Sequence, residues 1–175
     1  VGCGTASPCD GGAGRAFMGS CFRYFGPAVF GPGDVPPPQP ATARSPDGAV
    51  AWEVAQDVCA AWGGTLARVK GRGQMEVVRS LLREAAWVGA KSSTLSSPVH
   101  WGDGAPAAAW GGADMWGAPC SGGKRSGDCP EPASTEEACV VMGLGGLLRR
   151  ARCSGGVPGG GGGRGVVRGW VCERA

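Results

Sequence analysis

The residues of this sequence that are most informative about chemistry are its cysteines, which can bind metal ions or form disulfides. Nine of them stand among 175 residues, at positions 3, 9, 21, 59, 120, 129, 139, 153 and 172. No two form a Cys-x-x-Cys pair and His100 is the single histidine, so the closely spaced ligands of a structural zinc site are absent from the sequence. Dispersed cysteines in a small chain are instead typical of disulfides formed in an oxidising compartment. We therefore expect a disulfide-bonded protein that is extracellular or at the cell surface, binds no metal through its cysteines and has one cysteine left over.

Little in the rest of the sequence favours catalysis. His100 is the only histidine that could act as a general base, and neither paired carboxylates nor a nucleophile arrangement accompanies it. A net charge of +3 with scattered arginines does not indicate nucleic-acid binding. No apolar run approaches the roughly 18 residues of a membrane-spanning helix. We expect a protein that is not an enzyme, binds no nucleic acid and does not span a membrane.

Glycine and proline are unusually frequent, with 35 and 14 residues. This composition can indicate disorder, but nine cysteines and seven tryptophans require a crosslinked and buried core. The length suits a single domain. We expect an irregular Cys- and Gly-rich arm over residues 1–16, followed by one domain over 17–175. Within the domain, a Pro-rich loop insertion is predicted over 26–48 and a Gly-rich loop over 154–165.

Apolar spacing predicts two amphipathic helices in the first half of the domain. Over 49–62, Ala55, Val58 and Cys59 lie on one stripe, and a Gly-Gly pair at 63–64 ends the helix. A second stripe predicts a helix over 73–85. Beyond it, short Val- and Trp-containing segments alternate with Gly, Ser and Pro clusters, which is typical of strands and turns. Strands are predicted at 20–25, 86–90, 98–101, 138–142, 147–153 and 167–173.

The order of these landmarks resembles the C-type lectin-like domain, in the long form that has an extra N-terminal cysteine pair. The resemblance covers roughly Cys9 to Glu173. It implies an α+β fold in which two helices pack on small antiparallel sheets beside a long-loop region, stabilised by disulfides. The landmarks are Cys-Phe-x-Tyr-Phe from Cys21, Trp52-x-x-Ala55-x-x-x-Cys59, Gly63-Gly64-Thr65-Leu66-Ala67, Trp87-Val88-Gly89, Trp101-Gly102-Asp103-Gly104 and Gly169-Trp170-Val171-Cys172-Glu173.

The resemblance also implies disulfide pairings. Three of them would join the first helix to the last strand, close the long-loop region and hold the N-terminal arm: Cys59–Cys172, Cys139–Cys153 and Cys9–Cys21. Cys120 and Cys129 are close enough in sequence to close a further loop, Cys120–Cys129, which the family pattern does not require. Cys3 is then left over. Two interpretations stay open for it, an intermolecular disulfide and a bond to a segment outside this sequence.

Family members that bind sugar through calcium supply the oxygen ligands from three motifs, a Glu-Pro-Asn, a later Glu and a Trp-Asn-Asp. Ca2+ takes about 6 to 8 oxygens, so the set must be nearly complete. Here the first motif reads Glu131-Pro132-Ala133, Glu137 matches the second, and Leu148-Arg149-Arg150 stands at the third. Because guanidinium groups repel Ca2+ and pair with carboxylates, we expect no calcium and no other cofactor. We hypothesise that Arg149 or Arg150 replaces the ion by pairing with Glu131 or Glu137. The alternative is that the two glutamates are merely exposed acids.

Two functions stay open. In the first, the domain recognises carbohydrate or glycoprotein without a complete calcium site, through the faces of Trp110 and Trp116 and the Arg-rich end of the chain. Both tryptophans can equally be core residues, and the arginines can be a solvated face or a patch for acidic glycans. In the second, the domain is a protein–protein assembly subunit of an extracellular structure such as a cell wall, a matrix or a surface appendage. The lost calcium ligands, the odd cysteine and the long loops favour this alternative.

Overall fold

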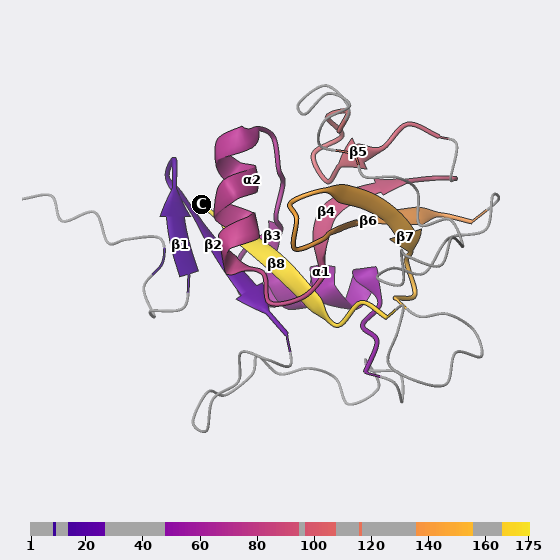
Figure 1. Ribbon diagram of the computed structural model, residues 1–175, viewed down its shortest axis with the longest axis horizontal. Helices are drawn as coiled ribbons and strands as arrows, with labels where there is room; N and C mark the ends of the chain where they lie inside the picture. The colour runs from indigo at the N-terminus through magenta and orange to yellow at the C-terminus, as the bar shows by residue number, and fades with distance from the viewer. Residues whose placement is uncertain are drawn as a thin grey trace, which may run out of the picture.

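The structure is a computed structural model that describes residues 9, 14–26, 48–94, 97–107, 116, 136–155 and 166–175. These residues form two helices and one sheet of eight strands (Figure 1). The strand order is β1-β2-β8-β4-β6-β7, while β3 pairs with β8 and β5 pairs with β4. No helix in the described ranges is long and apolar enough to cross a membrane. In chain order the elements are β1 (Gly14–Phe17), β2 (Ser20–Phe25), α1 (Trp52–Ala61), β3 (Thr65–Leu66), α2 (Arg72–Leu81), β4 (Ala86–Ser92), β5 (His100–Trp101), β6 (Ala138–Met142), β7 (Leu148–Arg152) and β8 (Gly169–Arg174).

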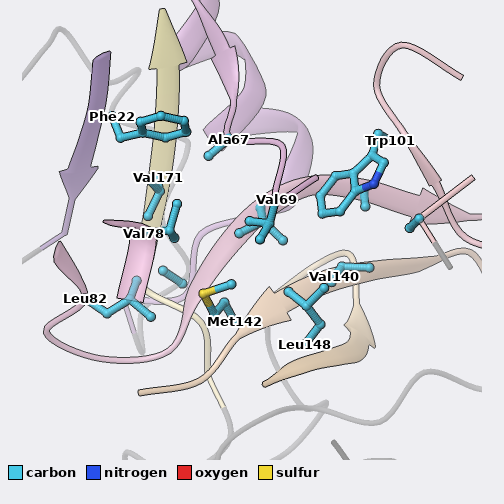
Figure 2. Close-up of a cluster of buried hydrophobic side chains, with 14 of the residues drawn as sticks. Phe22, Ala67, Val69, Val78, Leu82, Trp101, Val140, Met142, Leu148 and Val171 are labelled. Carbon is cyan, nitrogen blue, oxygen red and sulfur yellow. The ribbon is translucent and has the colours of Figure 1, made fainter. Parts of the chain in front are cut away.

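The sheet separates two hydrophobic cores. On β4, Val88 and Ala90 belong to the core that includes Val78 of α2, whereas Trp87 belongs to the core that includes Val58 of α1. Figure 2 shows the core on the α2 side. Side chains alternate across a strand, so β4 contributes to a core on each face. Helix α1 contacts β4 itself, whereas α2 lies against β1 and β2. All residues of β6 are buried as well, which explains why both strands read as nearly continuous apolar runs.

The sheet is mixed, whereas small antiparallel sheets were expected. The difference lies in one pair of strands, β4 and β8. The β1–β2, β2–β8, β4–β6 and β6–β7 pairs are antiparallel. In contrast, β4 and β8 run parallel, with Ala86 opposite Gly169 and Trp87 opposite Trp170. The chain path explains this. Because β6 runs antiparallel to β4 and β7 runs antiparallel to β6, β7 runs in the same direction as β4. The connection after β7 then places β8 beside β4 in that same direction.

Helix α1 begins later than predicted because the residues before it are extended. Ala51 has φ −69° and ψ 148°, and the carbonyl oxygen of Val50 accepts a hydrogen bond from the Trp87 indole at 2.7 Å. The predicted end is confirmed: Gly63 has a φ of 87°, in the left-handed region that glycine adopts without strain. Helix α2 ends at residue 81 rather than 85, because Leu82 is extended and buries its side chain.

The N-terminal hairpin is the element that differs most from the expectation. Residues 14–16, expected in an irregular arm, belong to β1, which pairs with β2 through a turn at Met18 and Gly19. Both turn residues have positive φ, 47° and 83°, as two-residue hairpin turns of type I′ require. The short sequence of β1 has no apolar alternation that could reveal it. The six predicted strands are all present, with bounds within two residues of those predicted.

Three disulfides crosslink these elements. Cys59–Cys172 joins α1 to β8, Cys139–Cys153 joins β6 to the residue after β7, and Cys9–Cys21 ties residue 9 to β2. They are the three pairings that the resemblance implied. Cys3 and the expected Cys120–Cys129 pair lie outside the described residues.

We predict that Cys59–Cys172 stabilises the fold more than Cys139–Cys153. The sequence separations are 113 and 14, and in the chain-entropy model loops of about 100 and about 15 residues contribute about 4.7 and about 3 kcal/mol. The double variant Cys59→Ala, Cys172→Ala should therefore lose roughly 2 kcal/mol more unfolding free energy than Cys139→Ala, Cys153→Ala, measured by urea denaturation. Equal losses for the two variants would contradict the entropic explanation.

Candidate functional site

The residues predicted for the long-loop site are only partly placed. Glu131, Pro132 and Trp110 lie outside the described residues. Trp116 forms an isolated parallel bridge with Leu148 of β7 and packs, half-buried, against the core on the α2 side. This position favours the core alternative for Trp116 over an exposed face that stacks on a sugar.

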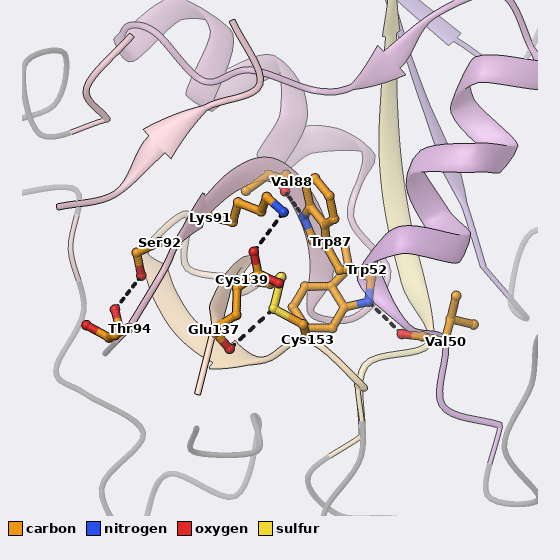
Figure 3. The surroundings of a disulfide bond; sticks show 10 residues. All are labelled: Val50, Trp52, Trp87, Val88, Lys91, Ser92, Thr94, Glu137, Cys139 and Cys153. Carbon is orange, nitrogen blue, oxygen red and sulfur yellow. Dashed lines mark hydrogen bonds and ion pairs between the residues drawn. A yellow bond between two sulfur atoms is a disulfide. The ribbon is translucent and has the colours of Figure 1, made fainter. Parts of the chain in front are cut away.

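Glu137, which immediately precedes β6, is paired with a cation from the neighbouring strand β4. The Nζ atom of Lys91 lies 2.7 Å from a carboxylate oxygen of Glu137 and 5.4 Å from the centroid of the Trp52 ring; Figure 3 shows this pair beside the Cys139–Cys153 disulfide. Both charged side chains are nearly half exposed, at 46% and 42%. Among the described residues, the cation that lies 2.7 Å from the Glu137 carboxylate is therefore Lys91 and not an arginine of β7. The hypothesis that Arg149 or Arg150 replaces the ion stays a prediction, because Glu131 lies outside the described residues.

The two arginines of the third motif lie on opposite faces of β7, since consecutive residues of a strand alternate. Both are half-buried. Burial lowers the pKa of the Arg150 guanidinium, and the Nε atom of Arg149 is buried with no hydrogen-bond partner among the described residues. The strand that carries the third calcium motif in the family therefore presents partly desolvated positive charge here, which disfavours a divalent cation.

One group of side chains within the described ranges has the spacing of a metal site. The ligand atoms of Glu53, Cys139 and Cys153 all lie within 4.8 Å of one another. The two sulfur atoms, however, are bonded to each other in a disulfide. Only the Glu53 carboxylate is left as a ligand, and one carboxylate does not hold a calcium or zinc ion.

Two adjoining hollows lie between α1, β4 and the turn after β5, and together we call them the Trp52 groove. Their cavity volumes are about 500 and 320 Å³. The hollows adjoin because both are lined by four shared residues, Trp52, Gly89, Lys91 and Gly102. The larger hollow extends to Ser97, His100 and Glu137, and the smaller one to Gln56, Arg68 and Asp103.

Glycines on two elements shape the floor of the Trp52 groove. A Cβ atom at Gly89 would lie 2.5 Å from the carbonyl oxygen of Leu66, so no side chain fits where β4 passes β3. The backbone N–H of Gly102 donates to the carbonyl oxygen of Gly89 at 2.9 Å, which fixes the turn after β5 against β4. The Trp87-Val88-Gly89 and Trp101-Gly102-Asp103-Gly104 landmarks thus meet at one place.

Lys91 was missed as a candidate site residue, although the sequence carries a signal for it. It is the one charged residue of β4, whose other residues are buried. A cation at the end of such a strand needs either solvent or a partner, and here it has both. The pairing itself could not be read from the sequence, because Glu137 precedes a different strand.

A network of charged side chains closes the other end of the groove. Asp103 accepts hydrogen bonds from Lys70, from Nη1 of Arg68 at 3.1 Å and from the backbone N–H of Ala105 at 3.1 Å. The hydrogen bond from Lys70 is the main cause that lowers the pKa of Asp103 to about 2, followed by that from Ala105. Arg68 also donates from Nε to the buried carboxylate of Glu173 on β8 at 3.3 Å. The network thus ties the turn after β5 to the end of the chain's last strand.

Comparison with known proteins gives a fold but no relative in sequence. No protein-family model matches the chain, and no curated protein matches its sequence. In structure it is similar to the cow C-type carbohydrate-recognition domain of CD23, at 18% identity and a TM-score of 0.56, over 93% of each chain. The mouse scavenger receptor C-type lectin carbohydrate-recognition domain matches at 16% identity and 0.55, over 93% of this chain and 95% of that chain.

A calcium-independent type II antifreeze protein is similar as well, at 15% identity and a TM-score of 0.53, over 94% of this chain and 92% of that chain. None of these three structures is described as an enzyme. The likenesses show that the chain has the C-type lectin-like fold, which confirms the fold expected from the sequence. The fold alone does not define a ligand, because proteins with different ligands share it.

We predict that Asp103 makes the fold sensitive to acid below about pH 4. The pKa of Asp103 in the folded state is about 2, below the ordinary value of about 3.9. Its ionised form therefore stabilises the folded state above pH ~4, and this stabilisation is lost as the pH falls towards 2. The variant Asp103→Asn should lose less unfolding free energy than the wild type between pH 4 and pH 2, measured by urea denaturation at each pH. The same pH dependence in both proteins would contradict this assignment.

Proposed function

We propose that this protein is an extracellular binding module that recognises carbohydrate or glycoprotein without a complete calcium site. Two similar structures are described as carbohydrate-recognition domains and a third as a calcium-independent antifreeze protein. The three disulfides of the described residues support a location outside the cytoplasm, because disulfides form and persist in oxidising compartments.

The ion pair between Lys91 and Glu137 is the observation that carries this proposal. Glu137 is the one calcium-ligand position of the family pattern that is both retained in the sequence and described in the structure. Its carboxylate has an ammonium group at 2.7 Å, where a second positive charge would be repelled. The protein thus supplies its own cation at this carboxylate.

Such a pair can bind sugar hydroxyl groups directly. The Lys91 ammonium has three donors and the Glu137 carboxylate has about four acceptor positions, so one contact between them leaves most of this capacity unused. A sugar carries neighbouring hydroxyl groups that both donate and accept. Hydrogen bonds to charged groups are among the strong ones in proteins, at roughly 1.5–3 kcal/mol each. Since both side chains are nearly half exposed, a sugar can reach them without a change of the backbone.

We predict that glycan binding does not depend on calcium. On a glycan array, the protein should give the same pattern of signals in excess chelator and in excess Ca2+, because no divalent ion takes part. Titration calorimetry with Ca2+ alone should give no stoichiometric binding heat. The buffer with chelator is the control for traces of metal.

Two results would overturn the proposal in different ways. Signals that appear only with Ca2+, together with a stoichiometric heat, would mean that residues outside the described ranges complete a calcium site. An array that stays silent in both buffers would remove the carbohydrate function and leave assembly with another extracellular protein as the explanation.

A further inference from the structure

The Trp52 groove differs from the long-loop site in its position and its parts. It lies on the α1 face of the sheet, between α1, β4 and the turn after β5. Of the predicted long-loop residues that the structure describes, only Glu137 lines it. Its two hollows, about 500 and 320 Å³, both fall in the range of roughly 300–1,000 Å³ that is usual for small-molecule sites.

The charged groups that line the groove are balanced among the described residues. Lys91 is paired with Glu137, and Arg68 is paired with Asp103 at 3.1 Å. An anionic ligand would have to approach Glu137 and Asp103, and a cationic ligand would have to approach Lys91 and Arg68. Neither sign of net charge is favoured, so the complementary ligand is neutral and polar.

The uncharged lining combines apolar surface with hydroxyl groups. The ring of Pro98 supplies apolar atoms, and the indoles of Trp52 and Trp101, which are 8% and 2% exposed, add a small apolar area. Ser93 and Ser97 supply hydroxyl groups on the rim. The Ser93 hydroxyl donates to Ser97 at 3.1 Å, and the Ser97 hydroxyl is also hydrogen-bonded to Thr94 at 2.7 Å. The Ser93 oxygen keeps acceptor capacity towards a ligand. Sugar rings present apolar C–H faces and hydroxyl edges, which is the mixture that this lining complements.

The backbone after β5 is open towards the groove. A Cβ atom at Gly102 would meet nothing closer than 3.8 Å, and one at Gly104 would meet nothing within 4 Å. Gly102 lines both hollows, so a ligand that occupies both passes directly over it. This geometry suits a ligand of more than one ring, with one ring in each hollow.

We propose that the Trp52 groove binds a neutral oligosaccharide of two or three sugar rings, with neighbouring hydroxyl groups on Lys91 and Glu137. The inference rests on the proposed carbohydrate function and assigns it a place and a ligand class. The larger hollow takes the ring that meets the ion pair, and the smaller hollow takes the ring beside Gln56 and Arg68.

The test fills the groove without disturbing the fold. In Gly102→Leu the new side chain has space, because the site is exposed and its φ lies outside the left-handed region. Gly145→Leu is the matched control: Gly145 is also exposed, has nothing within 4 Å and lies in the β6–β7 turn, next to residues that pack on α2. Lys91→Met removes the charge but keeps the aliphatic stem over Trp52.

The probes are neutral trisaccharides of glucose, galactose, mannose and N-acetylglucosamine, and a heparin-derived hexasaccharide, each titrated in chelator by calorimetry. We expect at least one neutral trisaccharide to bind the wild type and Gly145→Leu equally. Gly102→Leu and Lys91→Met should each bind it at least about tenfold more weakly, the loss expected for one hydrogen bond to a charged group. Thermal unfolding of all variants checks the fold, and Lys91→Met carries the test if Gly102→Leu does not fold.

Three results would overturn the inference and are distinguishable from a failure of the proposed function. Equal binding by the wild type and both groove variants would place the sugar site elsewhere while the carbohydrate function stands. Binding of the heparin hexasaccharide alone would assign the function to the arginines rather than to the groove. No binding of any trisaccharide, combined with a silent array, would remove both the groove and the proposed function.

Discussion

Burial of β4 on both faces is the constraint on which the rest of the structure depends. The strand lies between β8 and β6, with the core that includes Val58 of α1 on one face and the core that includes Val78 of α2 on the other. Its residues must therefore be apolar, and at Gly89 no side chain fits at all, because the carbonyl oxygen of Leu66 is too close. Only at its C-terminal end does the strand become accessible, and there Lys91 reaches solvent. The Trp52 groove lies where this burial ends.

The sequence predicts an element well when the element's own residues determine it, and poorly when contacts with distant residues determine it. The strand at 138–142 was predicted with its observed bounds, because burial on both faces gives an apolar run of the length of the strand. The start of α1 was predicted too early, because a hydrogen bond from the Trp87 indole to the carbonyl oxygen of Val50 holds the preceding residues extended. β1 was missed since a four-residue edge strand carries no periodic signal. The three disulfide pairings came from the family pattern and not from the spacing of the cysteines.

The candidate site was harder to predict than the fold for the same reason. Motif matching singled out Glu137 and the cationic third motif, since these are read from order along the chain. From the sequence, an arginine at 149 or 150 is one hypothesised partner of Glu131 or Glu137, whereas the structure has Lys91 of β4 at Glu137. Which of several cations meets a carboxylate depends on strand order and register, and β4 is the strand next to β6 in the sheet. Half-exposed ion pairs contribute only about 0–1 kcal/mol to folding, so this pair adds little to stability.

The arginines of β7 have a consequence that does not involve any ligand. Among the described residues, β7 and β1 are at the two ends of the main strand order, and on β7 Leu148 is bridged by Trp116. A strand edge that is left exposed is a template on which another chain can add a strand. β1 is short, whereas β7 carries Arg149, Arg150 and Arg152. Two copies meeting edge to edge along β7 would bring both sets of arginines together, and their repulsion opposes that association. The cationic residues at the third calcium motif therefore oppose edge-to-edge pairing of two copies along the part of β7 beyond Leu148.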